Sequence, residues 1–199
     1  MEALSSIGVL LGSSWASGVN LYLCIAGLGI TSRLGWIALP GNMDVLSHPL
    51  IIFLAIILYA IEFIADKIPY VDSVWDSVHT FIRPLGGAAL GFMAMADVGP
   101  VAQIPVALIT GTVALDSHLT KATTRAAINA SPEPITNSIA SVTEDASVVG
   151  AIYLIIRHPI IASIAVILFI AFSIWFLKKM FRFLKKVFSP RRRQESANT

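Results

Sequence analysis

The chain has 199 residues, of which 56% are hydrophobic and only 13% are charged, and its mean hydropathy is +0.78. A soluble domain carries about 25% charged residues, so this composition excludes an ordinary soluble protein. The formal charge of +2 is unevenly distributed, because eight of the 14 Lys and Arg residues lie between Lys178 and Arg193. The remaining body is therefore acidic, which favours cations or protons over anions as permeants.

Residues 5–30 carry no charge, but small and polar residues (Gly12-Ser-Ser and Ala16-Ser-Gly) interrupt the middle of this segment. A polar break at membrane depth must be buried against other helices or line a cavity. We therefore predict a broken span here, followed by a loop over residues 31–47 and a second span over 49–65. Pro49 fits the first turn of that second helix.

Residues 66–83 have the period of an amphipathic helix. Asp72, Asp76, His79 and Arg83 follow an i, i+4, i+7, i+11 pattern and share one face, while Val, Trp and Ile fall mainly on the other. We predict a helix that lies at the membrane interface or packs against the bundle.

Residues 85–115 are apolar but are interrupted by Asp97-Val-Gly-Pro100. The two pieces are short for separate spans. They fit one kinked crossing, a re-entrant hairpin or two spans, and we favour one crossing.

The segment from Asp116 to Ser147 is rich in polar residues. Pro132 and Pro134 flank Glu133, so the chain there is extended or begins a helix. Two sets of polar side chains have helical spacing, and these are His118, Lys121 and Arg125 before the prolines and Asn137, Ser141 and Glu144 after them. A last span is expected over residues 159–177.

Two apolar runs begin with the same dipeptide, His48-Pro49 and His158-Pro159, at an offset of 110 residues. This similarity indicates an internal repeat, with halves at about 8–65 and 131–177, a linker at 66–130, and a single transmembrane domain over 1–177. With five spans the two His-Pro helices run in opposite directions, which gives an inverted repeat. Six spans would make them parallel.

Residues 178–199 form a basic tail interleaved with Phe and Leu. It is expected to contact anionic lipid headgroups and to lie in the cytoplasm by the positive-inside rule. A five-span count then places Lys121 and Arg125 inside, and Lys67 and Arg83 outside. The composition indicates an integral membrane protein, and we predict that it lies in the bacterial inner membrane.

Two long polar motifs, EFIADKIPYVDSVWDSVHTFIRPLGGAALG (62–91) and HLTKATTRAAINASPEPITNSIASVTED (118–145), resemble the membrane protein family catalogued as domain of unknown function 4126. The resemblance covers most of residues 15–175 and implies a membrane protein, without an established activity. The family's characteristic polar positions correspond to Glu62, Asp66, Lys67, Asp72, Trp75, Asp76, His79, Arg83, His118, Lys121, Arg125, Asn129, Glu133, Asn137, Glu144 and Asp145.

Carboxylates beside broken helices in an apolar protein pair with cations, coordinate ions or carry protons. The first set of candidates for substrate or ion binding is Asn20, Glu133, Asn137, Ser141, Glu144 and Asp145. An ordinary interfacial loop and N-cap remains the alternative for these residues.

Two further groups of polar residues are candidates. A second cluster, which fits a proton relay, a gate or a solvated ion-paired face, is Glu62, Asp66, Lys67, Asp72, Asp76, His79 and Arg83. His118, Lys121 and Arg125 fit the binding of a headgroup or anion, or a cytoplasmic anchor.

We therefore predict an all-α integral membrane protein with about five (four to six) transmembrane helices, an inverted repeat, broken helices and an amphipathic interfacial helix. The favoured function is a small transporter or channel-like protein, coupled to protons or a cation through its membrane acids. The alternatives are a lipid-handling protein or intramembrane enzyme, and a structural subunit. The sequence predicts no cofactor and no nucleic-acid partner, it has no diagnostic metal-ligand or catalytic motif, and it leaves a bound cation and a homo-oligomer open.

Overall fold

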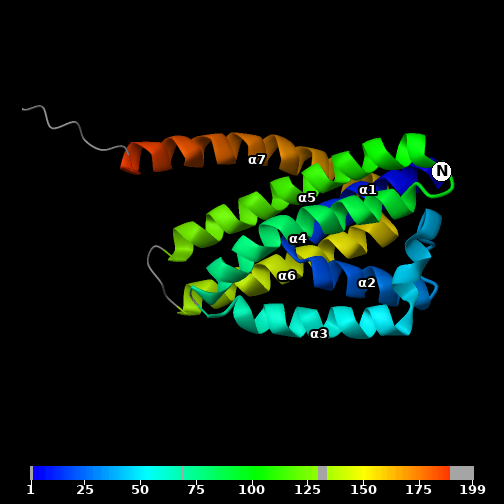
Figure 1. The fold of residues 1–199 in the computed structure, drawn as a ribbon, viewed down its shortest axis with the longest axis horizontal. Coiled ribbons are helices and arrows are strands. Elements are labelled where there is room, and N and C mark those ends of the chain that lie inside the picture. The colour runs from blue at the N-terminus through cyan, green and yellow to red at the C-terminus, as the bar shows by residue number, and fades with distance from the viewer. Residues whose placement is uncertain (1, 69, 130–133, 189–199) are drawn as a thin grey trace, which may run out of the picture.

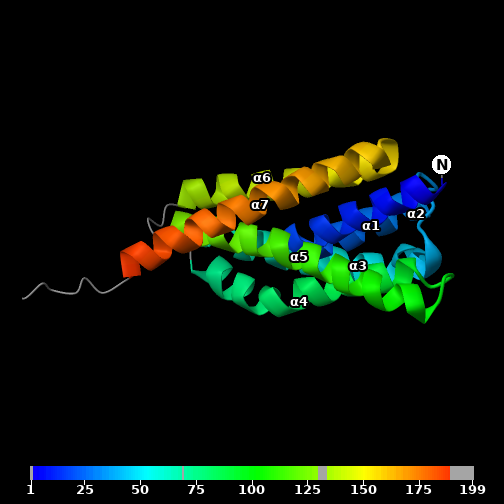
Figure 2. The ribbon, with the colours of Figure 1, turned by 90° about the horizontal axis from the view of Figure 1, so that it is seen from above.

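The computed structural model describes residues 2–68, 70–129 and 134–188. Every element in these ranges is a helix, and together they form an elongated bundle (Figures 1 and 2). The elements in chain order are α1 (Glu2–Val19), α2 (Leu21–Arg33), the 3-10 helix η1 (Gly41–Ser47), α3 (Pro49–Ala65), α4 (Val71–Ala94), α5 (Pro100–Asn129), α6 (Pro134–Arg157) and α7 (Pro159–Phe188).

The first two helices, α1 and α2, form a hairpin. α1 ends at Val19, Asn20 has an extended backbone, and the Asn20 side chain caps α2 by accepting a hydrogen bond from the Leu23 amide. One cavity is lined both by residues near the start of α1, such as Ser5, and by residues after α2, such as Trp36, so the chain returns to the end at which it began (Figure 1). The predicted break is confirmed, because α1 and α2 are separate helices on either side of Asn20.

α4 and α5 form a tightly packed antiparallel pair. Residues 95–99 turn the chain, with Gly99 in the left-handed region at φ +93°, and Pro100 begins α5. Gly87 and Gly91 of α4 lie where a Cβ atom would collide with α5, so glycine permits the close approach. The expectation of one crossing over residues 85–115 is therefore wrong, because the Val-Gly-Pro sequence makes a reverse turn and not a kink.

The faces of α4 are inverted relative to a helix of a soluble protein. Asp76 and Arg83 are buried, whereas Phe81 and Leu85 are 75% and 71% exposed. Of the two placements predicted for the amphipathic segment, packing against the bundle is the one found. An apolar outer surface around a charged interior is the arrangement that lipid surroundings favour.

The two His-Pro helices run in the same direction. α3 begins beside η1 and ends where Asp66 contacts Arg125, and α7 begins beside Gly8 and passes Asp116 at Ser173 (Figures 1 and 2). The parallel arrangement does not confirm the inverted repeat. α1 and α2 form a hairpin, whereas the corresponding helix before α7 is the continuous α6.

Three described helices, α5, α6 and α7, are long and apolar enough to cross a membrane, and the bent pair of η1 and α3 brings the number to four. Their lengths and composition indicate a membrane protein. Around the hairpin, near the end where the chain starts, an apolar core packs Val9, Leu10, Leu28, Met43, Leu46, Val148, Ile152 and Ile155. The opposite half of the same bundle is packed differently.

Candidate functional site

The half of the bundle beyond the hairpin tip contains a buried charge network. We use this name for nine residues of α3 to α6 and the turn after α3, in which three cationic side chains lie among six carboxyl groups. Within the described part of the chain, the network consists of Arg83, Lys121, Arg125, Glu62, Asp66, Asp72, Asp76, Glu144 and Asp145.

Arg83 connects α4 to the tip of the hairpin. Its Nη2 atom lies 2.7 Å from Glu62 Oε1, and its Nη1 atom donates to the carbonyl oxygen of Gly18 at 3.1 Å. The same Nη1 lies 2.9 Å from His118 Nδ1 and 3.5 Å from Asp76 Oδ1. The guanidinium thus satisfies a carbonyl that the end of α1 leaves without an intrahelical partner.

Lys121 of α5 lies at the centre of the network, where one ammonium is shared by four carboxylates. Its Nζ atom is 3.0 Å from Asp66, 3.4 Å from Glu144, 3.6 Å from Glu62 and 4.0 Å from Asp76. It also donates to the carbonyl oxygen of Val19 at 3.3 Å. The hairpin tip is therefore fixed by two cations from two different helices.

Arg125 joins α5 to α6 and to the turn after α3. It makes a two-pronged ion pair with Glu144 at 2.8 and 2.9 Å, the strongest geometry for this pair. It also donates to Asn137 Oδ1 at 2.7 Å and to the main-chain oxygen of Asp66 at 3.2 Å. Asp72 lies 3.9 Å away and is further bound by Asn129.

Asn20, at the break of the hairpin, contacts the network through Asp145. The Asn20 amide donates to Asp145 Oδ1 at 3.0 Å, and the Tyr59 hydroxyl donates to Asp145 Oδ2 at 3.1 Å. Lys67, beyond the end of α3, donates to Ser141 at 3.3 Å and lies over the Phe63 ring. Burial lowers the pKa of the Lys67 ammonium, and the carboxylates of Asp145 and Asp66 partly oppose this shift.

The network has more acids than bases, and several acid oxygens are unsatisfied. Glu62 Oε2, Asp66 Oδ1 and both carboxylate oxygens of Asp76 are buried and have no hydrogen-bond partner among the described residues. A buried carboxylate without a partner is expensive, so it takes up a proton, a cation or water. In the same described part of the chain, no three His, Cys, Asp or Glu side chains gather as a metal ion would require.

Residues 7–179 match the model of the family described as Domain of unknown function (DUF4126). The chain belongs to this family. The resemblance inferred from the two polar motifs is thereby confirmed. No curated protein and no solved structure matches the chain.

In this DUF4126 protein, the separate polar clusters expected from sequence converge on one network. Lys121 and Arg83, which the five-span topology placed on opposite sides of the membrane, share the carboxylate of Glu62, so that assignment is wrong. His79 is buried beside the network against Tyr22 at 3.1 Å, and His118 lies between Arg83 and Thr80. Glu133 lies outside the described residues.

Three contributors to the DUF4126 network were missed. These are Tyr59, which binds Asp145, and the main-chain carbonyls of Gly18 and Val19. Tyr59 precedes Glu62 by three residues and shares its helix face, a spacing that would have identified it. The carbonyls become available only because the helix breaks at Asn20.

Proposed function

We propose that the protein is a small proton-coupled transporter of the bacterial inner membrane, and that the charge network is its coupling site. The observation that carries this proposal is the surplus of carboxyl over cationic side chains in the network, six against three among the described residues, or six against four with Lys67, which like Glu144 is only partly buried. Lys67 at the edge reduces this surplus without removing it. In apolar surroundings such a surplus is neutralised by bound protons or cations, and the lack of a three-ligand metal arrangement in the described chain favours protons.

The positions of the charge network and the apolar core support a transport pathway that is closed in this conformation by apolar packing. The network occupies the half of the bundle beyond the hairpin tip, and the apolar core around α1 and α2 lies between it and the opposite end. At that opposite end, a cavity of about 610 Å³ is lined by Ser5, Trp36, Asp97 and neighbouring residues. We propose that the hairpin is the element that moves, since broken helices commonly line the binding sites of transporters.

The membrane orientation follows from the basic tail. α7 extends past the network end of the bundle (Figure 1), and we propose that this end faces the cytoplasm, where the tail would contact anionic lipid. A homo-oligomer remains part of the proposal, without a surface assigned to it.

The alternative of an enzyme acting on a lipid headgroup has less support. Its candidate residues were Asp72, Asp76 and His79, or His118 and Lys121, and they are 0%, 4%, 2%, 0% and 5% exposed. The first four side chains are buried away from a headgroup in this conformation, whereas Lys121 lines a cavity.

The test is proton flux into liposomes that contain the purified protein and a trapped pH dye, driven by a potassium diffusion potential. Glu62→Gln, Asp76→Asn and Glu144→Gln each remove a carboxylate without a large change in shape, and we expect each to lower the flux at least about tenfold, the usual effect of losing a proton-transfer group. Asp44→Asn is the matched control, because Asp44 is exposed in η1 at the opposite end. Wild-type flux in all three network variants would reject the proposal.

A further inference from the structure

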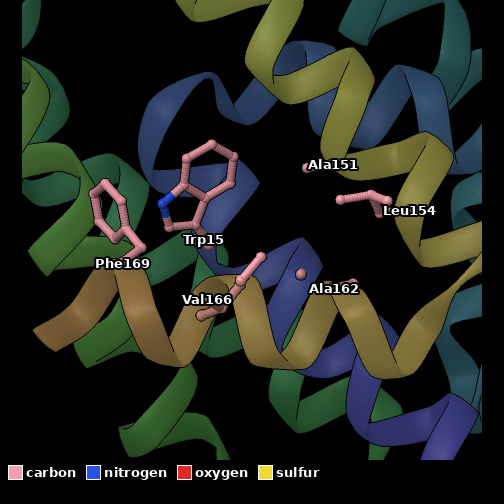
Figure 3. Close-up of a pocket in the computed structure, with 8 residues that line it drawn as sticks. Trp15, Ala151, Leu154, Ala162, Val166 and Phe169 are labelled. Carbon is pink, nitrogen blue, oxygen red and sulfur yellow. The ribbon is translucent and has the colours of Figure 1, made fainter. Parts of the chain in front are cut away.

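An apolar groove lies between α6 and α7 and is floored by α1. It has a volume of about 170 Å³. The residues that line it, shown in Figure 3, are Gly12, Trp15, Ala151, Leu154, Ala162, Ala165, Val166 and Phe169. α6 and α7 diverge from their common turn toward the network end (Figures 1 and 2). Ala165 is exposed, so the groove opens on the apolar outer surface that lipid would surround.

A second cavity, of about 190 Å³, lies beside this groove and reaches the charge network. Its lining is Trp15, Val19, Ser117, Thr120, Lys121, Thr124, Glu144, Ser147 and Phe169. The two cavities share Trp15 and Phe169, whose rings meet edge to face at 5.5 Å. Beyond this ring pair the mainly apolar walls also carry four hydroxyl groups, Lys121 and Glu144, whereas the groove is lined by apolar side chains and Gly12. This combination suits an amphipathic molecule.

The polar cavity offers mainly hydrogen-bond acceptors. Each of its four hydroxyl groups donates its own proton to a main-chain carbonyl, Ser117 to Trp15 at 2.9 Å, Thr120 to Asp116 at 3.0 Å, Thr124 to Thr120 at 2.8 Å and Ser147 to Glu144 at 2.6 Å. The lone pairs of these oxygens remain available. The cavity therefore suits a group that donates several hydrogen bonds.

The charge of the network beside the cavity also favours a cation. Glu144 lines it and is the most exposed acid of the ion-paired carboxylates, with 16% of its side chain accessible. Lys121, the cation in the lining, already has four carboxylates within 4.0 Å. An anion entering here would meet the acid surplus of the network, whereas an ammonium group would reduce it.

We propose that the two cavities form one binding site for a lipophilic amine, whose ammonium group occupies the polar cavity while its apolar body lies in the groove between α6 and α7. This inference rests on the proposed function, because it names the substrate class of the same network. The amine would enter sideways from the lipid, past Ala165, and its positive charge would compensate carboxylates that the three cations leave unbalanced.

Binding is tested in nanodiscs with 8-bromooctylammonium, whose bromine quenches tryptophan fluorescence. One variant keeps only Trp15, with the other tryptophans changed to Phe, and a second keeps only Trp175, which is 54% exposed on α7 and lies outside both cavities. We expect saturable quenching of Trp15 at probe concentrations that leave Trp175 little changed. Equal quenching of both would mean partition into lipid only and would overturn the site.

Substitutions and matched probes locate the two parts of the ligand. Ala165→Leu fills the groove, and we expect it to weaken binding about tenfold, as loss of a snug apolar contact does, while Ala171→Leu on the exposed side of the same helix leaves binding unchanged. Glu144→Gln should weaken binding of the ammonium about tenfold and leave 8-bromooctanol unaffected, because only the cation loses an ion pair.

Comparison with 8-bromooctanoate determines the sign of the charge. Tighter binding of this anion than of the ammonium, or an unchanged affinity in Ala165→Leu, would overturn the inference. Saturable amine binding in a protein that shows no proton flux would keep the binding site and reject the proposed function. Proton flux without amine binding would keep the proposed function and reject the binding site.

Discussion

The two halves of this bundle are packed in opposite ways. Around the hairpin, α1, α2, η1 and α6 bury Val9, Leu28, Met43 and Val148 at 3% exposure or less. Beyond the tip, α3 to α6 bury Arg83, Glu62 and Asp72 without any exposed surface. Equal burial with opposite chemistry indicates that the second half was not built for stability alone.

The physical reason is that a buried ion pair contributes little net free energy to folding. Desolvation of two charges largely offsets their attraction, and apolar residues of similar volume often stabilise a protein as well or better. In the network, the imbalance between acids and bases adds a further penalty. We therefore attribute the apolar half to stability and closure, and the charged half to ion coupling, and the following predictions probe this division.

The largest effect is expected on removing a cation from the network. Arg83→Met leaves Glu62 without its 2.7 Å partner and the Gly18 carbonyl without its donor. Loss of one partner of a buried pair typically lowers the free energy of unfolding by about 3–5 kcal/mol. Unfolding titrations in mixed micelles measure this loss, and a stability equal to that of wild type would show that the network is not a coupled unit.

The next largest loss of stability is expected at Gly18, where the hairpin tip packs against α5. A Cβ atom at Gly18 would collide with the Ala114 carbonyl and the Ser117 hydroxyl, whereas Gly150 has open space around it. Gly18→Ala should lower the free energy of unfolding by up to about 3 kcal/mol, as overpacking against main chain does, and should also reduce proton flux. Gly150→Ala is the control and should change neither quantity. Equal behaviour of the two variants would contradict the close fit of the hairpin.

The apolar half should respond through packing alone. Leu28 is fully buried in the core around the hairpin, and Leu28→Ala should lower the free energy of unfolding by about 2 kcal/mol because it leaves a cavity. Proton flux per folded molecule should remain near wild type. A loss of flux as large as that in the network variants would remove the distinction between the two halves.

The smallest change in stability is expected for a network acid. Neither carboxylate oxygen of Asp76 has a hydrogen-bond partner in the described chain, and its two cations lie at 3.5 and 4.0 Å. Asp76→Asn therefore removes a surplus negative charge and two long ion contacts, but no hydrogen bond. We expect the free energy of unfolding to rise or fall by less than about 1 kcal/mol, although flux is lost. Thermal unfolding and flux measured on one preparation test this pairing, and a large destabilisation would assign Asp76 a structural role.

Much of the site could be predicted from helical spacing. Asp72, Asp76, His79 and Arg83 share a face at the expected period, and that face is the buried one. Spacing identifies which residues share a face, but whether the face is inside depends on the surrounding solvent. In water the charged face of such a helix would be on the outside. In this protein the apolar faces are exposed, as they are in lipid, and the charged face is therefore on the inside.

The path of the chain was harder to predict. The break near Asn20 was expected from small and polar residues, but the return of α2 depends on tertiary contacts, such as the donation of Arg83 to the Gly18 carbonyl. The turn at Gly99 was mistaken for a kink, because local sequence does not show that α4 and α5 pack together over their length. The direction of the His-Pro helices followed from that error, since one missed turn reverses every later element.

The most direct test of the central claim is infrared spectroscopy of the carboxyl groups in the folded protein at neutral pH. We expect wild type to show the carbonyl stretch of a protonated, buried carboxyl group, because the network has more acids than cations. This band should weaken or disappear in Glu62→Gln or Asp76→Asn and persist in Asp44→Asn. A spectrum of wild type with only ionised carboxylates would contradict the claim that the network holds protons.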